Sequence, residues 1–521
     1  MKTQELNIKY EDIKSKQIFR ANEKEVERSI EPVPTHPIRN NFQRDRDRIL
    51  YSRAFRRLSG KTQVFTTSND DHIRTRLTHT LEVSQIARTI SKELGLDEDL
   101  TEAIALGHDL GHTPFGHVGE RTLNQIMNGC YKISDFNENI LDENKGFKHN
   151  LQGIRVVNEL EEEPLNLTKE TIWGIVNHSS KKYKKCLDLK KDDFVNCNLK
   201  HKNSKHDNCG YNLSLQYYDN YLNKLEHDKF WTIEGLVVAL ADEIAQRHHD
   251  IEDAIEFNIL SIRDIYDEIS KRFSEILKKY EYTNQRYSLD ELENEDNKYK
   301  AIAKFSKFIV DFLTTDLINQ TKANLIEMKG KFNIGSNSDF YNSRKKISNL
   351  PIENKEKEKS YILSIVSFSQ DVKAADEEFQ RFLKNRILKS FEAQRMDGVG
   401  SYIITKLFEA YTHNPQQLRD KTIDKLFKNI HDKKSDLKQI FNDDMDKGEK
   451  EFIGNVLDSF EKVKNTGDKR DFISDLHYKI MKHGFTIEDI YKNALMRTIC
   501  DYISGMTDNF AIKDHKSLYN K

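Results

Sequence analysis

The chain has 521 residues, which is enough to bury a large core and to form more than one domain. Its 83 lysines and arginines nearly balance its 85 aspartates and glutamates, so the overall charge does not identify a partner. Charged residues make up 32% of the chain and no apolar run approaches the length of a membrane span, which argues against a membrane protein. Five scattered cysteines predict no disulfide framework, and the N-terminus lacks the apolar core of a signal peptide, so we expect a cytoplasmic protein.

The distribution of prolines and apolar residues predicts an all-α fold. The chain contains only seven prolines, few of its segments alternate as strands do, and amphipathic helical patterns recur along its length. We expect an extended polar segment over residues 1–40, a helical core over 41–260, and a helical C-terminal region over 261–521 that packs on the core. An irregular stretch at about 180–228, rich in lysine, asparagine and tyrosine, is interpreted as an insertion in the core.

A basic stretch opens the predicted core. Over residues 41–65, arginines and a lysine surround a helical apolar pattern made by Ile49, Leu50, Ala54 and Leu58. A charge run of this kind usually forms a solvated face of a helix. It also fits a phosphate-binding surface, because the planar guanidinium group matches phosphoryl oxygens. The segment by itself leaves both interpretations open.

The next helical pattern places a histidine on an apolar face. Apolar residues recur at helical spacing between Asp70 and Gly95, and the stripe that they form includes His79. We therefore expect His79 to point into the protein. Arg76 precedes it by about one helical turn, and Gly95 is expected to end the helix.

A second helix is predicted to begin at Asp97 and to lead to the adjacent pair His108 and Asp109. Gly111 and Pro114 then indicate a tight loop, because both residue types interrupt helices. The loop and the helix that follows carry three more polar candidates for chemistry, which are His112, His117 and Glu120.

A carboxylate also lies within a strongly apolar helix further along the chain. Residues 232–255 show a clear amphipathic pattern, and Asp242 lies beside its apolar side, with Asp250 two turns later. A buried carboxylate without a positive partner is costly, so Asp242 requires a cation nearby.

Two imidazoles and two carboxylates from these helices would suit a divalent metal ion and leave coordination positions open for water or phosphate. The four residues are His79, His108, Asp109 and Asp242. A set without cysteine argues against a closed structural zinc site. We expect magnesium or manganese, with iron, cobalt and zinc as alternatives.

Seven motifs occur in order over roughly residues 40–515: RDRDRILYSRAFRRLSGKTQVF, RTRLTHTLEV, ALGHDLGHTPFGHVGE, FKHNLQGIRVV, EGLVVALADEIAQRHHDIEDA, RMDGVGSYIITKLFEAY and ICDYISGMTDNFA. Together they resemble the HD superfamily of metal phosphohydrolases, and within it the dGTPase-like deoxynucleoside triphosphate triphosphohydrolases. The resemblance covers most of the chain. It implies an HD-domain helical core with an additional C-terminal helical region.

The resemblance also implies roles for individual residues. His79, His108, Asp109 and Asp242 correspond to metal ligands. His117 and Glu120 correspond to a catalytic pair in which the carboxylate, one turn away, fixes the tautomer of the imidazole. His112 is placed with this catalytic pair, and both His112 and His149 correspond to histidines near the phosphates. The residues assigned to substrate binding are Arg57 (base or sugar), Arg76 (phosphate), His149, Gln246 and Asp250. Gln246 stands where several relatives carry a tyrosine near the sugar.

The reaction implied by the resemblance is hydrolysis of a dNTP to a deoxynucleoside and intact triphosphate. His117 would either protonate the leaving 5′ oxygen or assist the nucleophile, and the sequence leaves both roles open. Relatives lead us to expect a homo-oligomer, with a hexamer as the specific expectation, and an activator nucleotide. No membrane partner is expected.

Two other functions remain as alternatives. The first is another HD-type phosphohydrolase, such as a nucleotidase or a phosphodiesterase, which would keep the metal ligands. The second is a nucleotide-binding or single-stranded nucleic-acid-binding scaffold, to which the lysine-rich residues 181–205 would contribute electrostatically.

Overall fold

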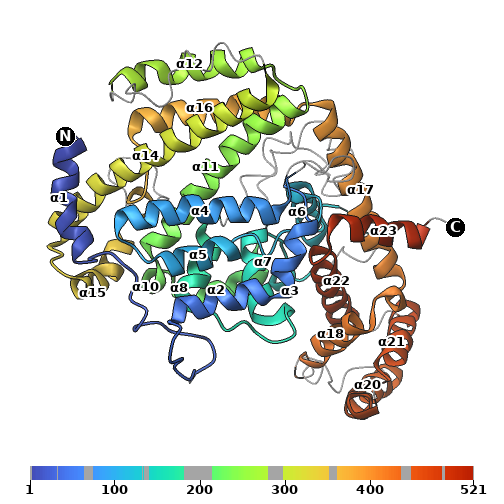
Figure 1. The fold of residues 1–521 in the computed structure, drawn as a ribbon. Coiled ribbons are helices and arrows are strands. Elements are labelled where there is room, and N and C mark those ends of the chain that lie inside the picture. Colours follow the sequence, from blue (N-terminus) through green and yellow to red (C-terminus); the bar gives the residue numbers. More distant parts are fainter. Residues whose placement is uncertain are drawn as a thin grey trace, which may run out of the picture.

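The computed structural model describes residues 3–519 except for 32, 64–73, 132, 134–139, 181–213, 280–296, 351–360, 434, 436–446, 467 and 484–486. The described residues form helices joined mostly by short connections (Figure 1). Two isolated β-bridges, Arg28 with Thr168 and Thr62 with Thr75, are the nearest approach to a sheet within these residues. The predicted all-α fold class is therefore confirmed.

The helices of the first half of the chain are α1 (Thr3–Ser15), α2 (Asn41–Tyr51), α3 (Arg53–Arg57), α4 (Arg76–Leu94), α5 (Glu98–Gly107), α6 (Gly116–Met127), α7 (His149–Arg155), α8 (Lys169–Asn177), α9 (Asp219–Lys224), α10 (His227–Phe230) and α11 (Ile233–Glu256). Those of the second half are α12 (Ile262–Lys279), α14 (Lys298–Phe332), α15 (Asn337–Ser348), α16 (Gln370–Ile387), α17 (Phe391–His413), α18 (Asp420–His431), α20 (Lys447–Thr466), α21 (Lys469–His483), α22 (Glu488–Ser504) and α23 (Asp508–Tyr519). A short π-helix, η3 (Val156–Leu160), follows α7 directly.

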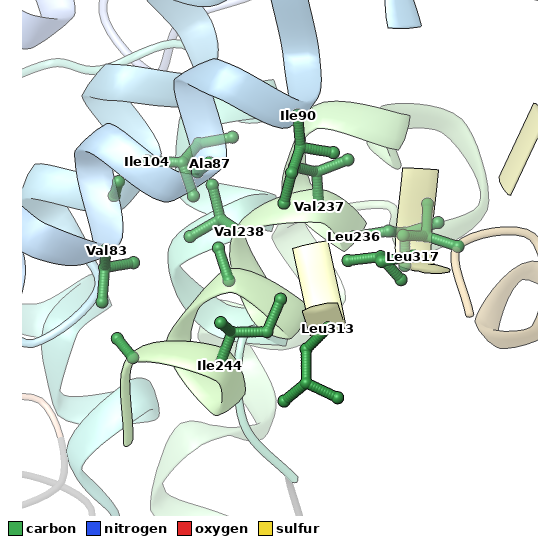
Figure 2. Packing of buried hydrophobic residues seen from close by; sticks show 14 of the residues in the cluster. Val83, Ala87, Ile90, Ile104, Leu236, Val237, Val238, Ile244, Leu313 and Leu317 are labelled. Carbon is green, nitrogen blue, oxygen red and sulfur yellow. The ribbon is translucent and has the colours of Figure 1, made fainter. Parts of the chain in front are cut away.

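Helix α11 lies at the centre of the larger core and packs against α4, α5, α8 and α14. Figure 2 shows Val83, Ala87 and Ile90 of α4 gathered with Val237 and Val238 of α11, and these five side chains are fully buried. Full burial of a valine or isoleucine side chain contributes roughly 1.5–3 kcal/mol. The two helices that supply His79 and Asp242 are therefore held rigidly side by side.

The first and last turns of these helices follow from local sequence. The Thr75 side chain caps the start of α4 by accepting from the backbone N of Thr78, so His79 lies in the first turns of the helix. Gly95 ends α4 with φ of 68°, a left-handed conformation that favours glycine. Asp97 caps α5 by accepting from Leu100 N at 2.9 Å. The predicted ends at Gly95 and Asp97 are confirmed.

The expectation of an extended segment over residues 1–40 is wrong for its first part, which forms α1. Leu6, Tyr10 and Ile13 are buried, and their spacing is that of one helix face. The Tyr10 hydroxyl donates to the backbone oxygen of Leu94 at 2.9 Å, which docks α1 on the end of α4. The many charged residues between these apolar positions gave the segment its polar appearance.

A second, smaller core lies at the C-terminal end of the fold (Figure 1). It combines residues 115–147 with residues 403–511, so α6 packs on α17 and α22 rather than only on its sequence neighbours. A buried ion pair also joins α7, which belongs to the larger core, to α22 of the smaller core. Its two atoms, Arg155 Nη2 and Asp501 Oδ2, are 2.6 Å apart. The division of the chain at residues 40 and 260 stays a prediction.

The expected irregular insertion at 180–228 lies mostly outside the described residues. Its last part, from Ser214 onward, contains η7 (Gln216–Tyr218) followed by α9 and α10, so this part is helical and not irregular. None of the helices in the described residues is long and apolar enough to cross a bilayer.

Candidate metal and active site

Three helices bring the four predicted metal ligands together. His79 comes from α4, His108 and Asp109 follow α5, and Asp242 comes from α11. His79 Nε2 lies 3.0 Å from Asp242 Oδ1, and His108 Nε2 lies 3.9 Å from the same oxygen. His108 Nε2 is also 3.5 Å from Asp109 Oδ1. The sequence prediction that His79 points inward is confirmed, because its side chain is buried.

The hydrogen bonds of His108 show that this group suits a metal ion. His108 Nδ1 lies 2.7 Å from the backbone oxygen of Ala105, which can only accept, so Nδ1 carries the hydrogen and Nε2 keeps its lone pair. Within the described residues, the buried Nε2 has no hydrogen-bond partner. A nitrogen lone pair that faces two carboxylates is satisfied by a divalent cation, and the backbone contact at Nδ1 is typical of metal-binding histidines.

The protonation states of the two carboxylates also favour cation binding. Burial acts to raise the pKa of Asp109, but His108, His112 and Arg76 outweigh burial and hold this pKa well below its usual range. At Asp242, burial is likewise outweighed, first of all by the hydrogen bond from His79, and the pKa is lowered. Both groups are therefore ionised at neutral pH, as metal ligands must be.

The predicted catalytic pair lies at the start of α6. His117 Nδ1 is 3.2 Å from Glu120 Oε2, and the side chain of His117 is 66% exposed whereas that of Glu120 is buried. Burial raises the pKa of Glu120, but His149, His117 and Lys148 together hold it well below its usual range. The result is a charged, buried carboxylate that orients an accessible imidazole.

A distant helix fixes the loop before α6. Phe115 and Gly116 both have φ of 59°, so the chain makes a left-handed turn immediately before His117. The backbone N of Phe115 donates to Asp508 Oδ1 at 3.0 Å, and the backbone N of Thr62 donates to Asp508 Oδ2 at 3.1 Å. The position of His117 therefore depends on α23.

His112 and His149 connect the metal-ligand group to the catalytic pair. His112 Nε2 lies 3.2 Å from Asp109 Oδ1, and its ring stacks on the ring of His149 with centroids 3.9 Å apart. His149 Nδ1 in turn lies 2.9 Å from Glu120 Oε2, the same oxygen that His117 approaches. Five of the predicted residues thus form one continuous array.

Arg76 is also part of this array. Its side chain is buried, and Nη1 donates to Asp109 Oδ2 at 2.6 Å. Within the described residues, Nε and Nη2 have no hydrogen-bond partner, so the guanidinium group keeps donors for an oxyanion. Gln246 lies one turn beyond Asp242 and donates from Nε2 to Asp250 Oδ1 at 2.6 Å.

Arg57 contacts Glu161, which lies outside this array, because its Nη2 is 3.7 Å from Glu161 Oε1. Arg57 also lines a cavity of about 760 Å³ between η3, α18 and α22. None of the other predicted site residues lines that cavity, although its wall includes Gly111 of the histidine loop. A contact of Arg57 with the base or sugar stays a prediction.

One histidine of the site was missed in the sequence. His178 follows α8, is buried, and its Nε2 lies 3.2 Å from Nε2 of His149. The only indication in the sequence that His178 points into the protein is its position at the end of the apolar helix of residues 169–177. That signal is weak, because a single histidine at a helix end is common.

Comparison with known protein families agrees with this geometry. Residues 76–247 match the HD domain, and residues 366–441 and 450–517 match the phosphohydrolase-associated domain. All four predicted metal ligands lie within the first match. The fold and the site therefore define an HD-domain phosphohydrolase.

Curated relatives identify the family within this class. Deoxyguanosinetriphosphate triphosphohydrolase-like proteins match from Bartonella henselae (29% identical, 100% of this chain and 98% of the relative) and Bartonella tribocorum (33%, 78% and 85%). A third, from Caldanaerobacter subterraneus subsp. tengcongensis, is 45% identical over 44% of this chain and 50% of the relative. The chain belongs to the family of deoxyguanosinetriphosphate triphosphohydrolase-like proteins.

Proposed function

We propose that this protein is a metal-dependent deoxynucleoside triphosphate triphosphohydrolase that releases a deoxynucleoside and intact triphosphate. The observation that carries the proposal is a continuous array of contacts. It runs from the His79–Asp242 pair through His108 to Asp109, and from there through His112 and His149 to Glu120 and His117. It unites a site for a cation, donors for phosphate and an accessible imidazole. The names of the curated relatives, which refer to deoxyguanosine triphosphate, support the same substrate class.

In this proposal His79, His108, Asp109 and Asp242 hold the metal ion. When bound, the ion would offset negative charge on the phosphate oxygens. Arg76, whose Nη1 donates to Asp109, would donate from Nε and Nη2 to the phosphate oxygens.

The contact between His117 and Glu120 determines which nitrogen of His117 meets the substrate. The ionised carboxylate of Glu120 can only accept, so Nδ1 of His117 carries the hydrogen and Nε2 is left for the reacting groups. Neutral His117 would take a proton from the attacking water through Nε2, and protonated His117 would give one to the leaving 5′ oxygen through the same atom. The same orientation of the His117 ring therefore allows it to act either as the base or as the acid.

Product analysis is the direct test of the proposed reaction. The purified protein is assayed with each dNTP alone and in pairs, with Mg²⁺ or Mn²⁺, and the products are separated by chromatography. We expect a deoxynucleoside and intact triphosphate. Pairs are included because we expect an activator nucleotide, and gel filtration with and without nucleotide tests the expected homo-oligomer. Release of orthophosphate or pyrophosphate would contradict the proposal and favour another HD-type phosphohydrolase.

Replacing Arg76 with alanine is expected to weaken binding of the triphosphate much more than binding of the nucleoside. A charge-assisted hydrogen bond to an anion contributes roughly 1.5–3 kcal/mol, or about 10- to 150-fold in affinity. Calorimetry with a dNTP and with the matching deoxynucleoside measures both effects. Arg76→Lys serves as the matched variant, because it keeps the charge but loses the planar fork. Equal losses for the two ligands would exclude a phosphate contact.

The scaffold alternative makes a different prediction. The lysine-rich residues 181–205 lie outside the described residues, and their contribution to nucleic-acid binding stays a prediction. Electrostatic binding of single-stranded DNA would weaken steeply with added salt. Absent or salt-independent binding would remove this alternative.

A further inference from the structure

Two faces of α4 and α11 meet beside the predicted metal ligands. His79 and Glu82 are three residues apart on α4, and Asp242 and His249 are seven residues apart on α11, so each pair shares one face of its helix. His79 Nε2 lies 3.0 Å from Asp242 Oδ1. The ring of His79 also meets the ring of His249 edge to face, with centroids 5.1 Å apart, and both rings are buried. His249 therefore contacts a residue that is assigned to the metal.

The carboxylate of Glu82 determines which nitrogen of His249 carries the hydrogen. His249 Nε2 contacts Glu82 Oε2, and Arg74 Nε lies 3.5 Å from the same oxygen. A carboxylate next to an arginine is ionised and only accepts, so Nε2 of His249 carries the hydrogen. Burial favours the neutral form of this ring. Nδ1 of His249 therefore keeps a lone pair.

The other nitrogen of His79 requires an acceptor. When His79 binds a cation through Nε2, its hydrogen is carried by Nδ1, and metal-binding histidines almost always donate this hydrogen to a neighbouring group. In the part of the chain that the structure describes, neither His79 Nδ1 nor His249 Nδ1 has a hydrogen-bond partner, although both atoms are buried. His108 differs, because the backbone oxygen of Ala105 already holds its Nδ1. A donor on one ring and an acceptor on the ring that it contacts can satisfy each other.

We propose that His249 is a positioning residue for the metal site. Its Nδ1 accepts a hydrogen bond from Nδ1 of His79, and Glu82 holds the opposite nitrogen of the His249 ring. Rings with centroids 5.1 Å apart can place two facing nitrogens roughly 3 Å apart after rotation about χ2, which is a soft torsion in histidine. This role of His249 rests on the metal-binding role of His79 in the proposed function.

The hydrogen bond acts on the metal through His79. An acceptor at Nδ1 fixes the orientation of the His79 ring and raises the basicity of Nε2, which is the ligand atom. The chain from Glu82 through His249 to His79 is a carboxylate–histidine–metal arrangement extended by one imidazole. Loss of such an outer contact lowers metal affinity by roughly 10- to 100-fold.

The surroundings of Glu82 favour this role over direct binding of a cation. Glu82, His248 and His249 have ligand atoms within 4.8 Å of one another. However, Glu82 Oε2 already accepts from His249, and it lies 3.3 Å from His248 Nε2 and 3.5 Å from Arg74 Nε. A guanidinium group next to this oxygen repels a metal ion. Glu82 therefore serves as a hydrogen-bond acceptor for the two histidines.

The affinity of the full-length protein for Mn²⁺, measured from the electron paramagnetic resonance signal of the free ion, tests the role of His249. Leucine and asparagine have the same branching, but only asparagine places an acceptor, Oδ1, where His249 has Nδ1. We expect His249→Leu to raise the Kd roughly 10- to 100-fold and His249→Asn to recover most of this loss. His248→Asn is the matched control, because it removes the neighbouring imidazole that also contacts Glu82, and it should keep the Kd of the unmodified protein.

An unchanged Kd in His249→Leu would overturn the proposal. Equal losses in His249→Leu and His249→Asn would also overturn it, because a role in packing alone predicts no recovery by an acceptor. If His249→Leu fails to fold, as judged by circular dichroism without metal, Glu82→Gln takes its place. This variant removes the charge that holds His249 and should raise the Kd, and an unchanged Kd would again overturn the proposal.

The role of His249 and the proposed function can fail separately. Loss of metal in Asp242→Asn together with an unchanged Kd in His249→Leu would overturn only the role of His249. A raised Kd in His249→Leu, in a protein that does not release triphosphate, would overturn only the reaction. An unmodified protein that binds no Mn²⁺ would overturn the metal site itself and the role of His249 with it.

Discussion

Replacement of Asp242 by asparagine is expected to remove the metal ion that is held with His79 and His108, and to reduce turnover to background. The substitution keeps the shape of the side chain but removes the charge next to His79 Nε2, which lies 3.0 Å from Asp242 Oδ1. A ligand that binds only the folded state stabilises it by roughly 2.7 kcal/mol at a concentration 100 times its Kd, so the variant should also lose the rise in Tm that metal gives the unmodified protein.

Metal content and thermal unfolding with and without Mn²⁺ measure these effects. Glu243→Gln is the matched control, because it removes the same charge from the next residue of α11, whose side chain is exposed. The control should keep its metal and its metal-dependent rise in Tm. If Asp242→Asn bound as much metal as the unmodified protein, Asp242 would not be a ligand.

Replacement of His117 by alanine is expected to lower kcat by roughly 10²- to 10⁴-fold while leaving metal content and Tm unchanged. His117 is 66% exposed, so its removal opens no cavity in the core, and its hydrogen-bond partner Glu120 keeps the contact with His149. A loss of activity in this variant would therefore report chemistry and not folding.

Steady-state kinetics with metal-loaded protein measures this effect. Arg121→Ala, which removes an exposed side chain four residues further along α6, is the control and should retain activity. Glu120→Gln tests the orienting role separately, because it removes the charge but keeps a group that can contact His117. Normal turnover in His117→Ala would refute its assigned role.

Much of the site could be predicted because its residues lie on helices with clear periodicity. The apolar stripe of α4 gave the inward direction of His79, and the apolar side of α11 gave the position of Asp242. Helix caps at Gly95 and Asp97 marked where the chain turns between α4 and the His108–Asp109 pair. In these cases, local sequence and tertiary packing agree.

The features that could not be predicted from the sequence depend on contacts between segments that lie far apart in the chain. The helix α1 is stabilised by docking on the end of α4, through Tyr10, and its charged residues conceal the apolar face. His178 joins the site only because α8 packs against α5 and α7, which no local pattern reveals. The cavity that Arg57 lines likewise depends on the C-terminal helices that form its opposite wall.

The anchoring of the loop before α6 by Asp508 has a consequence for how the protein matures. Phe115 and Asp508 are 393 positions apart, yet a hydrogen bond between them holds the turn from which His117 projects. A ribosome produces residue 115 long before residue 508, so a nascent chain can assemble the helices around His79 while its imidazole–carboxylate pair still lacks its final support. The imidazole–carboxylate pair would then gain its final support only after the segment that carries Asp508 has left the exit tunnel, and fragments that end before this residue would lack that support.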